Sequence, residues 1–416
     1  MGRGIRVQVV NNTDLPMKID VVELDDIKQG GDGSDPMALR DMVPPRSKHP
    51  YEPQYIENYS AVRDGVFTVV VRTPYVTEDV GRLCFRGSNT GFRNTYRTFH
   101  NADILVDALM ADDLIEITID GARTIGKGIP YMKLAFDDKA KLIGEQKAEE
   151  GLIHSFVRRN GLTDLMFFAH GFNNSQRDAR NVYQSYFERF EPPVAGKKLG
   201  IVGISWPSQA ADASAGASAV ANAAAGALKY KAFYDMHTLA GEVGNHLGWI
   251  VNVVMQENPG VAVHLAGHSM GGHLAASALA PIKAPERVKS VFLIQAATSA
   301  LIFSPAGDLG GKHRTVGGPV IGTFSSEDLQ VVGLWTWAQT AKTIVNLGRG
   351  ATDVLAMGGA GPLACGAHDV SMGNEHAEYS FAAGNAYALH CPDLKNHDDY
   401  KTEAFARAHQ RAAGLV

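Results

Sequence analysis

The feature that most constrains this chain is a serine at the junction of an apolar segment and a helix-forming segment. The apolar residues 261–267 are followed by His268, Ser269, Met270 and Gly271, which complete the pattern G-x-S-x-G. A buried strand that turns sharply into a helix is the setting in which this pattern holds a nucleophilic serine. Glycines let the neighbouring backbone approach closely, and the helix N-terminus favours a developing negative charge. We therefore predict that Ser269 is a nucleophile; the alternative is a structural turn with an inert serine.

Strands and helices alternate on both sides of this turn. The apolar segments predicted as strands are residues 163–171, 198–206, 261–267, 288–296 and 319–326. The longest intervening helix is predicted between Tyr230 and Glu257, where apolar residues recur every three or four positions. Such alternation implies parallel strands with helices on both faces of the sheet. We expect residues 123–416 to form a doubly wound, mostly parallel α/β domain that carries the chemistry.

Residues 1–122 have a different pattern, in which apolar and polar residues alternate over short segments. Ile5, Val7 and Val9 alternate with polar residues, and turn-rich segments such as GGDGSDP separate this run from the next ones. A period of two indicates strands with one buried face and one solvated face. We predict a smaller antiparallel β-domain here, with the form of a sandwich and a role accessory to the second domain.

Composition and charge exclude several classes of function. Of the 416 residues 45% are hydrophobic, and the formal net charge of -5 lacks the basic excess of a nucleic-acid binder. The three cysteines form no disulfide framework. The N-terminus has no apolar signal core, and no stretch reaches the roughly 18 apolar residues of a membrane span. We expect no nucleic-acid partner and no transmembrane segment, and a cytoplasmic location by default, with export by another route left open. The oligomeric state is not indicated.

A His-Gly-Phe segment that begins at His170 ends the first long apolar strand of the second domain. In a sheet of this kind the loop after that strand supplies one N–H group to the oxyanion hole, and the residue after the nucleophile supplies the other. These residues would be Phe172 and Met270. We also expect His170 and His268 to contact the substrate. The alternative for this segment is an ordinary turn at the end of a strand.

Three motifs together resemble a known family. The segments FFAHGFNNS (167–175), ISWPS (204–208) and HLAGHSMGG (264–272) are similar to those of a bacterial family of α/β-hydrolases. Its members are described as esterase/lipase-superfamily proteins of unknown function. The resemblance covers roughly residues 130–405 and implies a hydrolase core, ester-type chemistry and no cofactor. It does not identify the substrate, and the N-terminal region lies outside it.

The acid of a catalytic triad is expected after a later strand. The segment PVIGTFSSEDL puts Glu327 and Asp328 just beyond one. In the family pattern a strand that ends in a serine-bearing turn is followed by Asp, which matches Asp328, with Glu327 as the second choice. A solvated acidic turn is the alternative. The preceding strand ends in Gln295, Ala296 and Ala297 and offers no carboxylate there.

The general base is the position with the most candidates. The histidines after Asp328 are His368, His376, His390, His397 and His409. On this topology the base lies on the loop after the last strand. NAYALHCPD fits that strand, and His397 lies on the loop after it and matches the family's terminal histidine. We expect His390 to lie within the strand and face a helix layer. His368 and His376 lie in a Gly-rich connection whose irregular route could still bring either one in.

Two other clusters could suggest binding sites. His390, Cys391, His397 and Asp398 are possible metal ligands, but they lack the paired short spacings of zinc sites, so we predict no metal. In the β-domain, arginines alternate with aromatic residues and could bind anionic headgroups or sugars, although a solvated face is favoured. The residues concerned are Arg82, Phe85, Arg86, Phe92, Arg93, Tyr96 and Arg97.

The segment between Ala210 and Leu228 consists almost entirely of small residues. Small side chains form helix without a strong packing preference, so this segment is either a movable lid or an insertion with no special role. The leading functional hypothesis is hydrolysis of a small-molecule or lipid carboxylic ester by Ser269, His397 and Asp328. The alternatives are a lipid-cleaving antibacterial effector, and a binding module in the β-domain attached to a degenerate hydrolase core.

Overall fold

The structure is a computed structural model of the 416-residue chain. It describes residues 4–13, 15–29, 34–57, 65–73, 79–88, 91–99, 105–111, 114–120, 124–143, 146–172, 176–208, 219–325, 357, 361–363, 365–372, 380–391, 394, 396–397 and 399–416. Among these residues, no helix combines the length and the apolar character that crossing a bilayer requires.

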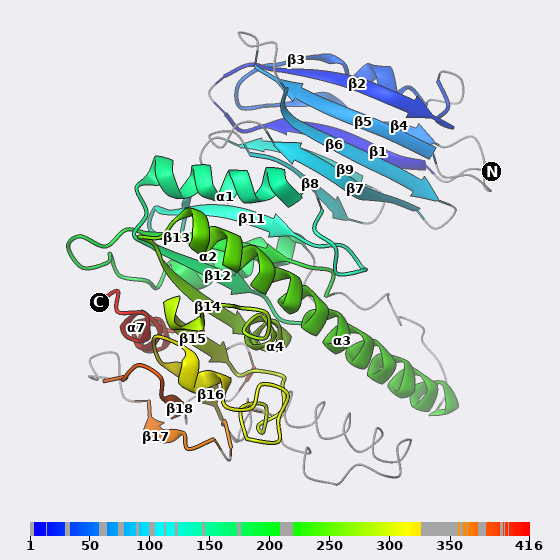
Figure 1. The fold of residues 1–416 in the computed structure, drawn as a ribbon. Helices are drawn as coiled ribbons and strands as arrows, with labels where there is room; N and C mark the ends of the chain where they lie inside the picture. The colour runs from blue at the N-terminus through cyan, green and yellow to red at the C-terminus, as the bar shows by residue number, and fades with distance from the viewer. Residues whose placement is uncertain are drawn as a thin grey trace. The chain divides into compact units, whose positions relative to one another are not determined.

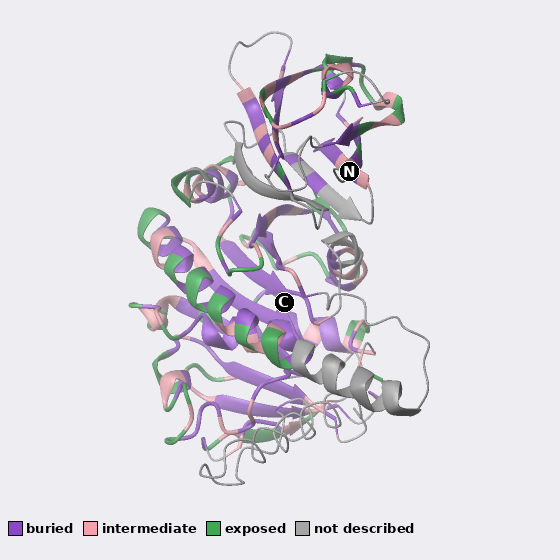
Figure 2. Cartoon of the chain, turned by 90° about the vertical axis from the view of Figure 1, so that its right-hand side faces the viewer, coloured by how far each residue is buried: buried purple, intermediate pink, exposed green. Residues whose placement is uncertain are grey.

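The chain divides into two compact units. The first comprises Met1–Arg123 with Leu142–Arg158, and the second comprises Thr124–Lys141 with Arg159–Val416. The helix α1 (Gln146–Asn160) lies mainly within the first unit. Each unit has its own sheets and its own buried side chains (Figures 1 and 2).

The first unit contains two β-sheets (Figure 1). The five-stranded sheet is antiparallel and has the order β3 (Asp41–Val43), β2 (Met17–Asp25), β5 (Gly65–Arg72), β6 (Asp79–Ser88) and β7 (Gly91–Phe99). The four-stranded sheet has the order β4 (Ser47–Glu57), β1 (Gly4–Asn11), β9 (Leu114–Asp120) and β8 (Leu105–Ala111). Its pairs are antiparallel apart from β1 and β9, which run parallel. The expected antiparallel β-domain at the N-terminus is thus confirmed.

The two sheets of this unit pack against each other through alternate residues. Val7 and Val9 on β1 are fully buried, as the period-two pattern predicts. A Cβ atom on Gly81 of β6 would lie 2.5 Å from the Val106 side chain of β8, so the two sheets meet closely at that point. A side chain at position 81 would push the sheets apart.

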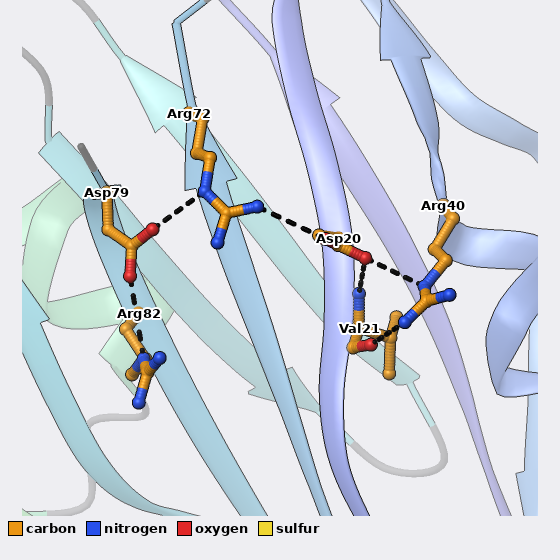
Figure 3. A network of polar contacts seen from close by, with 6 residues as sticks. All are labelled: Asp20, Val21, Arg40, Arg72, Asp79 and Arg82. Carbon is orange, nitrogen blue, oxygen red and sulfur yellow. Dashed lines mark hydrogen bonds and ion pairs between the residues drawn. The ribbon is translucent and has the colours of Figure 1, made fainter. Parts of the chain in front are cut away.

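Charged side chains connect three strands of the five-stranded sheet (Figure 3). Arg72 on β5 contacts Asp20 of β2 at 3.1 Å and Asp79 of β6 at 2.8 Å. Arg40 contacts the same Asp20 carboxylate at 2.7 Å, and Arg82 lies 3.7 Å from Asp79. These groups are partly exposed, so each pair adds little to stability. Arg82 of the arginine cluster predicted from the sequence is therefore paired within this network.

The second unit is built on one nine-stranded sheet. Its order is β10 (Thr124–Ile125), β11 (Ile129–Ala135), β13 (Leu199–Ser205), β12 (Asp164–Ala169), β14 (Ala262–His268), β15 (Val288–Ile294), β16 (Val320–Phe324), β18 (Ala386–His390) and β17 (His368–Ser371). All neighbouring pairs are parallel except the β10–β11 hairpin. The predicted mostly parallel α/β sheet is confirmed, with β14, which leads to Ser269, in its middle.

Helices cover both faces of this sheet. α2 (Gln176–Phe187) and α7 (Glu403–Ala412) share a buried cluster with Met166 and Phe168 of β12. The alternate residues Leu165 and Phe167 are also buried and point to the opposite face, which α3 (Ala219–Glu257) and α4 (Met270–Ser277) cover. The strands of the sheet are accordingly buried along most of their length (Figure 2).

Some elements differ from the predictions. The strands β11 and β17 were not expected from the sequence. The helix α3 begins at Ala219, well before the predicted start at Tyr230, so the backbone of residues 219–228 in the alanine-rich segment is helical. Residues 210–218 lie outside the described residues, and the lid hypothesis stays a prediction.

Candidate active site

Ser269 occupies a strained turn between β14 and α4. Its φ is 56° and its ψ is -122°, a region that side-chain-bearing residues rarely adopt, and its side chain makes no capping hydrogen bond to the helix. The backbone N–H of Ser269 donates to Ile294 O at 2.8 Å, and Ala297 N–H donates to Ser269 O at 2.9 Å. Strain of this kind persists only where the surroundings hold it, and it is concentrated at functional sites.

The glycines of the motif are required by close backbone contacts. A Cβ on Gly267 would lie 2.1 Å from Gly271 O, and one on Gly271 would lie 2.3 Å from Ala169 O. Real Cβ atoms do not approach so closely, so any larger residue would displace the turn. The strand β14, the turn and the end of β12 are thereby packed into one rigid unit around Ser269.

The segment predicted to supply an oxyanion donor lies directly against this turn. A Cβ on Gly171 would lie only 2.9 Å from the Cβ of Ser269. Phe172 follows Gly171, and its ring meets Phe233 of α3 edge-on, with 5.8 Å between the centroids. Met270, the other predicted donor, is the first residue of α4 and is buried. The structure therefore brings Phe172 and Met270 to the two sides of Ser269, and their role as donors stays a prediction.

His170 is buried within the protein beside this segment. Its ring stacks on Trp206 at 5.6 Å between centroids, and its Nδ1 lies 3.0 Å from Gly171 O and 3.4 Å from Ser208 Oγ. The Trp206 indole N–H donates to His170 O at 3.1 Å. The Trp-Pro-Ser segment after β13 thus packs against His170, which begins the segment predicted to supply an oxyanion donor. The predicted contact of His170 with a substrate stays a prediction.

His268, which precedes the serine, is also buried. Its Nε2 lies 2.9 Å from His397 O, and because a carbonyl only accepts, this nitrogen carries the proton and donates. The ring stacks on Tyr400 at 4.1 Å between centroids and lies 4.5 Å from the His397 ring. Burial and the nearby His397 lower the pKa of His268 well below its ordinary value, so the ring is neutral. The predicted contact of His268 with a substrate remains untested.

His397 reaches the turn from the loop that follows β18. It is half-buried, and its contacts with His268 bring it beside the residue that precedes the nucleophile. The same loop is attached to the end of β16, where the Ser325 hydroxyl donates to Leu394 O at 2.8 Å. Asp328 and its alternative Glu327 lie outside the described residues. The structure therefore brings His397 to the site and leaves the acid as a prediction.

The other late histidines have different surroundings. His368 is exposed on the edge strand β17, and its ring lies 5.4 Å from that of Tyr387. His390 is the half-buried last residue of β18, and its ring lies 5.0 Å from that of its cross-strand partner Phe324; the expectation that it faces a helix layer stays a prediction. His376 lies outside the described residues. His409 is fully buried in α7.

The cluster considered for metal binding does not converge in the described part of the chain. The Cys391 thiol donates to Leu389 O, while His390 and His397 contact Phe324 and His268 respectively. Asp398 lies outside the described residues. Nowhere in the described ranges do three His, Cys, Asp or Glu side chains gather in a way that could hold a metal ion.

A second group of Ser, His and Asp residues was not anticipated from the sequence. It lies near the amino ends of the central strands, whereas Ser269 follows the carboxyl end of β14. Asp164 Oδ1 is 3.2 Å from His264 Nε2, and His264 Nδ1 is 2.9 Å from Ser290 Oγ. Lys197 Nζ also contacts Asp164, at 3.0 Å. Burial would raise the pKa of Asp164, but hydrogen bonds from His264, Thr163 and Lys197 outweigh it and lower the pKa.

This group has the hydrogen-bond order of a catalytic triad but no access to a substrate. Asp164, His264 and Ser290 are each 0% exposed. Burial lowers the pKa of His264, which is therefore neutral, donates from Nε2 to the carboxylate and accepts the Ser290 hydroxyl at Nδ1. These residues tie the beginnings of β12, β14 and β15 together. Their function is structural.

Comparison with known proteins bears on the second unit. Residues 145–310 match a family model described as an alpha/beta hydrolase of unknown function (DUF900). This range includes both the Gly171 segment and the turn at Ser269. No curated protein sequence matches the chain.

The solved structures that match the chain are distant in sequence and have low TM-scores. TT1662 from Thermus thermophilus is 14% identical with a TM-score of 0.33, over 60% of this chain and 87% of that one. A Trichoderma reesei cutinase in complex with a C11Y4 phosphonate inhibitor is 15% identical with a TM-score of 0.21, over 36% and 66%. A Pyrococcus horikoshii acylaminoacyl peptidase is 10% identical with a TM-score of 0.28, over 84% and 52%.

Proposed function

We propose that the chain hydrolyses carboxylic esters with Ser269 as the nucleophile, on the premise that residues 145–310, which match the alpha/beta hydrolase family model, form the core of a hydrolase. The observation that carries the proposal is the backbone of Ser269. A non-glycine residue with φ of 56°, held between the Gly171 segment and the loop of His397, is costly to maintain. A structural turn has no need of a serine in this conformation, whereas a nucleophile must be presented in this way.

In the proposed reaction His397 accepts the proton of the Ser269 hydroxyl as its oxygen attacks the ester carbonyl carbon. Asp328 orients His397 and stabilises its protonated form. The negative charge on the tetrahedral intermediate is stabilised by the N–H groups of Phe172 and Met270. When the intermediate collapses, the bond to the alcohol breaks and His397 protonates the departing oxygen.

The second half of the reaction releases the acid. His397 accepts a proton from a water molecule, which attacks the carbonyl carbon of the acyl-serine. A second tetrahedral intermediate forms at the same two N–H groups and collapses to free acid, while His397 returns the proton to Ser269. No cofactor takes part in these steps.

The aromatic residues next to the oxyanion segment favour an apolar acyl group. Phe172 would supply a donor N–H, so its side chain flanks the bound carbonyl, and its ring packs on the buried Phe233 of α3. An apolar chain beside these rings would be removed from water, which gains about 25 cal/mol per Å² of buried apolar surface. A charged or strongly polar acyl group would lose hydration without compensation.

The test is turnover of p-nitrophenyl acyl esters of increasing chain length by the purified full-length chain. We expect hydrolysis by the wild type and a loss on the order of 10⁴-fold or more in kcat for Ser269→Ala, with unchanged thermal unfolding. Ser290→Ala serves as the matched control, because it removes a hydroxyl from the other Ser-His-Asp group. Absence of turnover across the ester series, or full activity of Ser269→Ala, would contradict the proposal.

A further inference from the structure

We propose that His268 and Ser325 are positioning residues that hold the loop of the general base from two sides. The inference rests on the proposed function, in which His397 is the base. It adds that the residue before the nucleophile and the residue at the end of β16 each fix one backbone carbonyl of this loop. Neither residue is a reacting group.

The first contact comes from the nucleophile turn. His268 is the last residue of β14 and directly precedes Ser269, so the strand leaves it little freedom to move. Its Nε2–H donates to His397 O at 2.9 Å, and its ring contacts those of His397 and Tyr400, with 4.5 Å and 4.1 Å between the centroids. The position of the base is therefore set by the element that carries the nucleophile.

The second contact comes from the strand that precedes the expected acid. Ser325 is fully buried and follows β16, and its hydroxyl donates to Leu394 O at 2.8 Å. The backbone at this point is also joined to the start of the loop, because Cys391 N–H donates to Phe324 O at 2.8 Å. The end of β16, which precedes the predicted acid in the sequence, is thereby joined to the loop that bears His397.

The loop between these two contacts has its own internal support. The Asn396 N–H donates to the Asp399 carboxylate at 2.8 Å, which closes a short turn around His397. Tyr400 is fully buried and packs on His268. Fixing the carbonyls of Leu394 and His397 locates the proposed base along the chain.

The neutral state of His268 suits this role. His397 becomes positively charged when it accepts the proton of Ser269. A second positive charge at 4.5 Å between ring centroids would oppose that step. Burial lowers the pKa of His268 well below its ordinary value, so the donor at Nε2 persists without a charge.

A misplacement of about 1 Å between reacting groups can lower a rate by about 10²-fold, which sets the expected size of the effect. His268→Phe keeps the ring but removes the donor, and we expect kcat to fall about 10²-fold with little change in KM. His268→Gln restores a donor and should recover part of that loss. Ser325→Ala should lower kcat by about tenfold, because one of two contacts remains.

The matched control is His409→Phe. His409 is also fully buried and stacked on an aromatic ring, that of Phe292 at 4.2 Å, but it makes no described contact with the loop. All variants are measured as full-length proteins for kcat, KM, the pH profile of kcat and thermal unfolding. We expect the His268 variants to lower the height of the pH profile without moving it, and His409→Phe to affect unfolding alone.

Four outcomes separate the possibilities. Wild-type kcat in His268→Phe would overturn the inference. A fall in kcat that His268→Gln does not relieve and that His409→Phe reproduces would also overturn it, since this would mean a general loss of structure. If the wild type hydrolyses no ester, the proposed function itself fails, and the inference fails with it. If the wild type is active and His397→Ala keeps full activity, His397 is not the base, and the inference fails while ester hydrolysis stands.

Discussion

The strand β14 has a histidine near each end, and each histidine lies close to a serine, yet the two regions are opposite in character. At the beginning of the strand, His264 is hydrogen-bonded to Asp164 and to Ser290, and all three are 0% exposed. At its end, His268 precedes Ser269, whose backbone is strained and whose side chain caps nothing. The first region satisfies its polar groups, whereas the second holds a serine in a strained backbone conformation without a capping hydrogen bond from its side chain.

This difference teaches that residue identity and hydrogen-bond order do not define a catalytic site. The Asp164 group has the order of a triad but is closed off by the strands that it joins. The Ser269 region is recognised by the strained backbone of its serine and by its place at the carboxyl ends of parallel strands, where ligands bind in open α/β sheets. Geometry and access, rather than composition, separate the two.

The largest expected effect concerns His397, the proposed general base beside the turn at Ser269. His397→Ala should lower kcat about as severely as Ser269→Ala, by about 10⁴-fold or more, and the double variant should be scarcely worse than either single one. His368→Ala and His390→Ala should keep substantial turnover, since neither contacts the turn. Additive losses in the double variant, or inactivation by His390→Ala, would move the role of base to another residue.

The next largest effect is expected on the free energy of unfolding, from substitutions in the buried group of Asp164, His264 and Ser290. Asp164→Asn removes the carboxylate that His264 and Lys197 contact, and losing hydrogen bonds to a charged group costs about 1.5–3 kcal/mol. Ser290→Ala should cost about 1–3 kcal/mol, because His264 loses one partner. Urea unfolding checks both values. Under conditions where each variant is folded, its kcat should equal that of the wild type, and a selective loss of kcat would break the comparison.

A change of pH is expected to have a smaller effect on the free energy of unfolding. Burial lowers the pKa of His409 from 6.5 to about 3, so the unfolded chain binds a proton that the folded protein does not bind until about pH 3. The free energy of unfolding therefore falls as the pH drops below 6.5, by about 1.4 kcal/mol per pH unit for one such histidine.

His409→Phe isolates this contribution. Between pH 7.5 and pH 5 the wild type should lose about 2 kcal/mol more stability than the variant, as measured by urea unfolding at the two pH values. Equal losses in the two proteins would mean that His409 is protonated in the folded state. His268, whose pKa is lowered in the same direction, adds to the wild-type slope but is present in both proteins.

The smallest expected effect concerns substrate preference. Phe233→Ala removes the ring that packs on Phe172, and we expect the ratio of kcat/KM for octanoyl over acetyl esters to change several-fold. Tyr234→Ala is the matched control, since Tyr234 is the next residue on α3 and is 45% exposed. A similar change in both variants, or in neither, would remove Phe233 from the account of specificity.

The sequence was sufficient for the features that depend on local pattern. The alternation of strands and helices, the turn at Ser269 and the strand before His397 all follow from periodicity and glycine placement. β11 was missed because its apolar residues do not form a distinct run, and β17 because it is a four-residue, largely exposed edge strand.

Contacts between distant residues could not be predicted in this way. Asp164 and His264 are 100 positions apart, and His268 and His397 are 129 apart, so no local signal connects them. The place of His268 in the motif indicated only that it lies near the nucleophile, and its neutral, donating role required the position of the His397 carbonyl. Asp328 remains a prediction from the family pattern.

The central claim, that Ser269 and not Ser290 is the reactive serine, is tested most directly by labelling the intact chain with a fluorophosphonate and mapping the adduct by mass spectrometry. We predict a single adduct on the peptide that contains Ser269, unchanged in Ser290→Ala and absent in Ser269→Ala. An adduct on Ser290, or no adduct on a folded protein, would contradict the account.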